Sequence, residues 1–201
     1  MKLLLRRTLV LYNSNEQRNY PNAITMIKKF LIASLLFLFL FQCKLYSQDT
    51  IDWRPSYKLK WNDFEASPNA NSKYGASSTC SISYAFSYKN DSLHFKVDAF
   101  FTRSLSWSKF KDDVALLRHE QGHFDISELF ARKLRMELTA YIVNTSTINE
   151  DVRTIFDKLW YEKKTCDSLY DIETDHARIF QKQIEWNRKI ATELNNLNNY
   201  K

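Results

Sequence analysis

Residues 114–134 read VALLRHEQGHFDISELFARKL, and this stretch combines the clearest helical pattern of the chain with its most distinctive chemical motif. Apolar or histidine side chains recur at three- and four-residue spacing, which indicates one face of a helix. We place the N-cap at Ser108, with Asp112 and Asp113 in the first turns. The stretch predicts a long helix that packs against the rest of the domain.

Within this helix, His119, Glu120 and His123 form a His-Glu-x-x-His motif. Two histidines four residues apart lie one helical turn above each other, so both imidazoles can reach one metal ion. The adjacent glutamate can take a proton from metal-bound water and later deliver it to the leaving group. The motif predicts a Zn²⁺ site with His119 and His123 as ligands and Glu120 as the catalytic general base.

Gly122 stands in the middle of this motif, where glycine costs a helix about 1 kcal/mol relative to alanine. We interpret this as a crowded position, at which another backbone segment or the substrate passes close to the helix.

A catalytic zinc ion takes a third protein ligand and keeps one position open. We predict His176 as that ligand, in the late stretch YDIETDH at residues 170–176. Glu173 and Asp171 remain alternatives, because carboxylates either bind a metal directly or orient an imidazole that does. His94 falls in a predicted strand and is interpreted as structural.

Two alternating stretches precede the motif helix. Large apolar and small or polar side chains alternate over residues 80–88 and 93–99, with a turn at residues 89–92, which predicts a hairpin. Residues 100–107 either extend the second strand or start a third.

Beyond the motif helix the pattern stays helical. We predict a break at residues 144–149, a second helix over residues 150–164, and a third from Asp167 towards Leu194. Strands followed by helices predict an α+β domain, with a small antiparallel sheet followed by a helical half.

The N-terminal residues have the parts of an export signal. A basic segment at residues 27–29 precedes an unbroken apolar run at residues 30–41, and Ser47 offers a small residue for cleavage. The run is short for a membrane span, which favours a signal peptide. We therefore expect a secreted or periplasmic protein of the cell envelope, with no stable membrane span after signal removal.

Met26 directly precedes this signal, so we expect translation to start there and residues 1–25 not to be translated. Residues 26–47 are then the signal peptide and residues 48–201 a single mature domain.

The formal net charge of +6 belongs mostly to this N-terminal part. Residues 1–47 hold seven of the 29 Lys and Arg and one of the 23 Asp and Glu, which leaves 22 of each in the remainder. A balanced domain lacks the basic surface that nucleic-acid binding needs, so we expect no nucleic-acid partner. Cys80 and Cys166 would either form a disulfide or remain separate thiols.

Residues 117–126, LRHEQGHFDI, resemble the active helix of a family of bacterial secreted proteins that are described as predicted zinc-dependent proteases. The resemblance extends over about residues 53–194. It also includes Trp61-Asn62-Asp63-Phe64, Ser106-Trp107, Tyr170-Asp171, Thr174 and His176.

This resemblance implies a zincin-like metallopeptidase, in which a strand edge beside the active helix binds an extended peptide or protein substrate. It assigns metal binding to His119 and His123, the general base to Glu120, and, by the late motif, a third ligand to His176. The chain departs from the family pattern at Ala177, where glycine is expected.

Two classes of function remain open. The first is a zinc-dependent hydrolase, most simply a peptidase, with an amidase acting on cell-wall material as a variant that the fold does not distinguish. The alternative is a non-catalytic envelope or interaction protein, in which a structural zinc site clamps the helices together.

Overall fold

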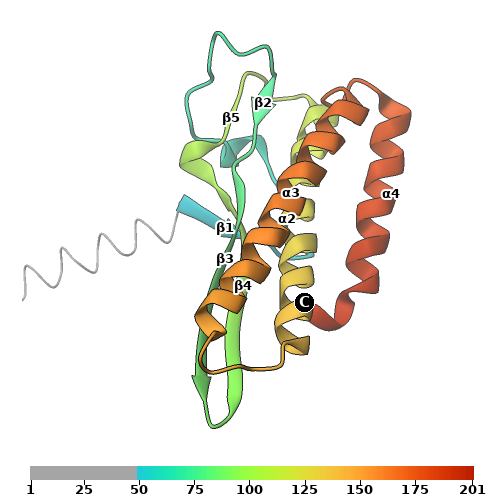
Figure 1. The fold of residues 1–201 in the computed structure, drawn as a ribbon. Helices are drawn as coiled ribbons and strands as arrows, with labels where there is room; N and C mark the ends of the chain where they lie inside the picture. The colour runs from blue at the N-terminus through green and yellow to red at the C-terminus, as the bar shows by residue number, and fades with distance from the viewer. Residues whose placement is uncertain (1–48) are drawn as a thin grey trace, which may run out of the picture. The chain divides into compact units, whose positions relative to one another are not determined.

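The computed structural model describes residues 49–201, which form an α+β domain with a small antiparallel sheet and three α-helices (Figure 1). This agrees with the fold class expected from the order of strands and helices. The expected start at Met26 and the signal peptide at residues 26–47 lie outside the described residues. Within residues 49–201, no helix is both long enough and apolar enough to cross a membrane.

The main sheet has three strands in the order β1-β4-β3, namely Thr50–Asp52, Ser92–Thr102 and Cys80–Lys89. The predicted hairpin is confirmed, because β3 and β4 pair antiparallel from Lys89 opposite Ser92 to Cys80 opposite Phe101. Two left-handed residues, Asn90 and Asp91, close it with φ angles of 52° and 57°, which suits a tight hairpin turn.

A separate two-stranded ribbon joins β2 (Ala76–Ser77) to β5 (Trp107–Ser108). Both alternatives for residues 100–107 are present. The second strand, β4, extends to Thr102, and a further strand, β5, begins at Trp107. Short 3-10 turns complete the order of elements: η1 (Trp61–Asp63), η2 (Arg103–Leu105) and η3 (Asn198–Tyr200).

The motif helix is α2, Val114–Ala140. Its N-cap is Asp113, whose carboxylate accepts the Leu116 N–H at 2.9 Å. The prediction of Ser108 as N-cap is wrong, because Ser108 belongs to β5 and its hydroxyl donates to the Phe110 carbonyl.

The two later helices are α3, Ile148–Thr174, and α4, Phe180–Asn196. The predicted boundary before Asp167 is wrong, because α3 continues through that position without interruption. The break falls instead at Asp175, His176 and Ala177, which have left-handed φ angles of 45°, 51° and 73°. His176 therefore lies in the turn between α3 and α4 and not on a helix.

Helix α2 is the centre of the domain, because it contacts β3, β4, α3 and α4. The C-terminal part of α2 packs into a large apolar cluster through Ile126, Phe130 and Leu134. Its first turns pack into a second cluster, in which Leu116 and Phe124 meet Trp61, Phe64 and Phe101. Each fully buried apolar side chain contributes about 1.5–3 kcal/mol. The two clusters fix α2, and with it the histidine pair, from both sides.

Candidate metal site

The two histidines of the motif point at the same atom. The Nε2 atoms of His119 and His123 each lie 3.0 Å from Oδ1 of Asp171, which projects from α3. Their rings are 4.9 Å apart between centroids, and His119 is 1% exposed. The four-residue spacing on α2 therefore brings both imidazoles to one point between α2 and α3.

His176 reaches the same oxygen from the turn after α3. Its Nδ1 lies 3.4 Å from Asp171 Oδ1. The turn allows this return because the His176 N–H donates to the Asp171 carbonyl at 3.1 Å, and the Ile179 N–H donates to that of Thr174 at 2.9 Å. The left-handed turn thus folds His176 back over the last turns of α3.

Three side chains form the tightest candidate ligand set of the described residues. One ligand atom each of His119, Asp171 and His176 lies within 4.8 Å of the other two. His123 is not within this distance of every member, but it contacts the set through Asp171. The sequence thus named every member, with Asp171 only as an alternative. The other alternative, Glu173, points elsewhere and accepts the Trp186 indole N–H at 2.8 Å.

Each motif histidine has a second partner at its other ring nitrogen. Nδ1 of His123 lies 2.9 Å from Asp167 Oδ1, and the other oxygen of Asp167 accepts the buried Lys163 ammonium at 2.7 Å. Nδ1 of His119 lies 3.1 Å from Gln183 Oε1, which comes from α4. Such partners fix the orientation of a ring and leave its Nε2 directed at a metal.

The charges of this cluster are strongly coupled. Burial lowers the pKa of His123, but hydrogen bonds to Asp167 and Asp171 outweigh burial and raise that pKa to about 10. Burial raises the pKa of Asp171, yet its hydrogen bonds to His119 and His123 hold the pKa well below its usual range. Asp167 and Asp171 therefore stay ionised, as metal ligands and their supports must be, whereas a metal ion at His123 would have to displace the proton that this raised pKa favours.

Gly122 is required by Tyr170. A Cβ atom at this position would lie 2.7 Å from Cζ of Tyr170 and even closer to its hydroxyl. The Tyr170 hydroxyl is buried against α2, where it donates to the His119 carbonyl at 3.1 Å and accepts from Gln183 Nε2 at 2.6 Å. The crowding expected at Gly122 is present, but it comes from a side chain of α3.

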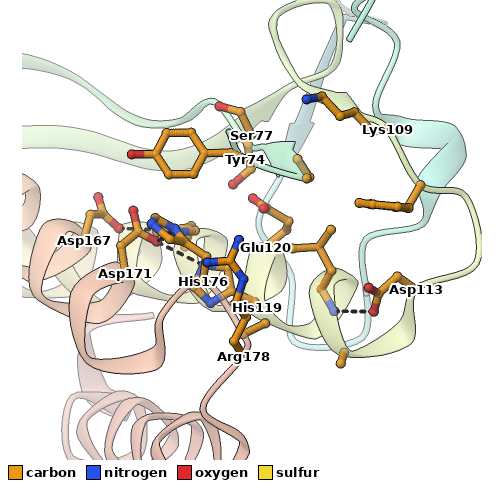
Figure 2. A pocket seen from close by; sticks show the side chains of 18 of the residues that line it. Tyr74, Ser77, Lys109, Asp113, His119, Glu120, Asp167, Asp171, His176 and Arg178 are labelled. Atoms are coloured by element: carbon orange, nitrogen blue, oxygen red, sulfur yellow. Dashed lines mark hydrogen bonds and ion pairs between the residues drawn. The ribbon is translucent and has the colours of Figure 1, made fainter. Parts of the chain in front are cut away.

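Glu120 lies beside these ligands and is 4% exposed. Among residues 49–201 no side chain forms a hydrogen bond or an ion pair with its carboxylate. Glu120 lines an open cavity of about 680 Å³ together with His119, His123, Asp171 and His176. Figure 2 shows its carboxylate on the cavity side of α2, close to the histidines. Its carboxylate is therefore a free acceptor that faces an open cavity.

The opposite wall of the cavity is the segment that contains β2. Residues 73–78 line it, and the Tyr74 ring packs on the His176 ring with centroids 4.5 Å apart (Figure 2). Cys80 also lines the cavity, and Cys80 and Cys166 are both free thiols. The two cysteines are therefore separate thiols in the structure and do not form a disulfide with each other.

Several residues of the site were not singled out by the sequence. A signal for two of them existed, since Lys163, Asp167 and Asp171 are spaced by four and lie on one face of a continuous helix. The predicted helix boundary before Asp167 concealed this stripe. Gln183 and Tyr74 carry no local signal, because tertiary packing alone brings them to the histidines. His94 lies exposed on β4, among residues that take no part in the site.

Fold and site together define an α+β domain with a candidate His/Asp/His metal centre in an open cavity. The chain belongs to the family described as "Bacterial protein of unknown function (DUF922)", whose model matches residues 56–177. The match includes α2, α3 and the turn with His176, and it ends before α4. No curated protein and no solved structure matches the chain.

Proposed function

We propose that the protein is an exported zinc-dependent metallohydrolase of zincin-like arrangement, most simply a peptidase of the cell envelope. In this proposal His119, His123 and His176 hold the ion and Glu120 is the general base. The proposal depends on one observation: three imidazole nitrogens converge on one carboxylate oxygen, beside a buried glutamate that has no hydrogen-bond or ion-pair partner within residues 49–201.

The donor set supports a metal in this position. His119 and His123 each face an acceptor oxygen at both ring nitrogens, so both contacts of a ring can be hydrogen bonds only if that ring carries two protons. A metal ion at Nε2 would remove this requirement. Imidazole nitrogen with carboxylate oxygen is a usual ligand set for zinc. Asp167 and Gln183 orient the two helical histidines from outside. The residues present therefore fit the ion.

When bound, zinc supplies a Lewis acid that brings the pKa of a coordinated water to about 7. The chain's own contribution is then proton transfer and positioning. The Glu120 carboxylate is free to accept a proton inside the cavity and to return it to a leaving group. Within the wall formed by residues 73–78, the short strand β2 (Ala76–Ser77) offers extended backbone to the cavity, which supports a peptide as substrate.

Glu120→Gln tests the catalytic part of the proposal. The amide keeps the shape of the side chain but cannot take a proton, so we expect peptide cleavage by the zinc-loaded protein to fall about 10²- to 10⁴-fold. Zinc content should stay unchanged, because the ligands are intact.

The matched control is Glu137→Gln, which makes the same change near the other end of α2, where Glu137 forms no ion pair among the described residues. It should leave both cleavage and zinc content unchanged. Equal behaviour of the wild type and Glu120→Gln across broad peptide libraries would exclude the peptidase.

A structural zinc site is the second candidate, and Asp171 is the observation that favours it. If Asp171 bound the ion together with the three histidines, four protein ligands would close the coordination sphere. Glu120→Gln would then have no effect, while chelation would strongly destabilise the fold. A zinc-loaded crystal structure with a water on the ion, facing the cavity, would exclude this candidate.

A further inference from the structure

We propose that the substrate of this site carries a carboxylate next to the bond to be cleaved, and that Lys73, Lys109 and Arg178 bind it. This inference rests on the proposed function, since it concerns the same cavity. We call these three residues the basic end.

The three cations of the basic end line the same cavity. The Tyr74 ring packs at a tilt against the His176 ring, and the Lys73 ammonium lies 5.2 Å from the centre of the Tyr74 ring. The Lys109 N–H donates to the carbonyl of Gly75, the residue after Tyr74, at 2.8 Å. Arg178 follows His176 by two residues and lines the same cavity. Figure 2 shows Lys109 above Glu120 and Arg178 below it, on opposite sides of the cavity.

The positive charge of the basic end is mostly uncompensated. Among the described residues Lys73 has no acidic partner, and the Lys109 ammonium donates to a carbonyl, that of Ser72. Arg178 pairs with Asp175 at 3.2 Å, but both side chains are exposed and such a pair is weak. The nearby Asp113 is already used as the N-cap of α2. Free cations at the mouth of a cavity attract an anionic group.

Lys163, the fourth cation that lines the cavity, differs in this respect. It is buried and is neutralised by Asp167 at 2.7 Å. The basic end is therefore the part of the lining whose cations have no buried acidic partner among the described residues. A substrate that lies along the wall of residues 73–78 would place its carboxylate at the basic end.

Two sources of a carboxylate are possible in a peptide, namely the C-terminus and an acidic side chain. Binding of labelled short-peptide pools with randomised central residues to zinc-loaded Glu120→Gln distinguishes them without cleavage. One pair of pools differs only in a free or amidated C-terminus, and a second pair only in Glu or Gln beside the central residues. We expect the carboxylate member of one pair to bind about fivefold tighter at low salt.

In the triple variant Lys73→Gln, Lys109→Gln and Arg178→Gln this preference should disappear, as it should in high salt. The control triple variant Lys89→Gln, Lys158→Gln and Arg188→Gln removes the same charge from exposed positions outside the cavity. It should keep the preference. The same two triple variants, made in the protein that retains Glu120, should show the corresponding changes in KM for cleavage.

The outcomes separate this inference from the function on which it rests. Cleavage by the wild type without any carboxylate preference, or a preference that the triple variant keeps, overturns the basic end and leaves the hydrolase standing. Carboxylate-dependent binding that the triple variant loses, without any cleavage, supports the basic end and counts against the peptidase. Absence of both overturns both.

Discussion

Ala177 stands where the resemblance leads us to expect glycine, and its backbone conformation is an unfavourable one for alanine. Its φ of 73° is left-handed, and such a conformation costs a residue with a Cβ atom about 1–2 kcal/mol. Ala177 directly follows His176, so the strain lies in the turn that returns a candidate ligand to Asp171. Glycine would adopt the same backbone without strain.

Ala177→Gly should therefore stabilise the protein. We expect the free energy of unfolding to rise by about 1 kcal/mol, measured by urea denaturation. Ala191→Gly is the matched control, because Ala191 lies inside α4 and the same change there should cost about 1 kcal/mol. Changes of equal sign at the two positions would contradict a strained turn.

Among the helices, α3 supplies the two aspartates that contact the motif histidines. One stripe of its surface presents Lys163, Asp167 and Asp171 at four-residue spacing, and Asp167 joins the buried lysine to His123. These three side chains share one face only because α3 is continuous from Ile148 to Thr174.

Asp167→Asn should weaken zinc binding without removing a ligand. Loss of a carboxylate that orients a ligating histidine typically costs 10- to 100-fold in metal affinity, and we expect an effect of about tenfold or more in a competition titration. Asp157→Asn on the same helix is the control, because within residues 49–201 Asp157 forms only an exposed pair with Arg153. Equal zinc affinities for the two variants would show that Asp167 does not support His123.

The elements differ in how far the sequence predicts them. The β3–β4 hairpin and α2 are predictable because alternation and helical spacing are local patterns. The boundary between α3 and α4 is not, because Asp175 and Ala177 take left-handed conformations without glycine or proline to mark them.

The site divides in the same way. His119 and His123 share one target because four residues make about one helical turn. Gln183 and Tyr74 reach these histidines only through tertiary packing.

For the whole molecule, the candidate metal centre lies where three helices meet. Ligands on α2 and in the turn between α3 and α4 would be joined by one ion, and α4 holds His119 through Gln183. Anything that binds the folded state alone stabilises that state.

Zinc should accordingly raise the melting temperature. At a hundredfold excess over the Kd the gain is about 2.7 kcal/mol, or roughly 5–10 °C for a chain of this size. Thermal unfolding with zinc and with a chelator measures the shift. His176→Ala should reduce it, whereas His94→Ala, the control histidine on β4, should keep it whole. A shift that survives in both His119→Ala and His176→Ala would place the ion elsewhere.

Helix α4 lies beyond the part of the chain that the family model matches, yet Gln183 from α4 contacts both His119 and Tyr170. Arg132 of α2 also donates to the Leu194 carbonyl at 2.7 Å, which ties the end of α4 to the central helix. A shortened fragment cut at the edge of the family match would retain every proposed zinc ligand and still lose the clamp on one of them. Expression boundaries for work on this protein should therefore be drawn after α4.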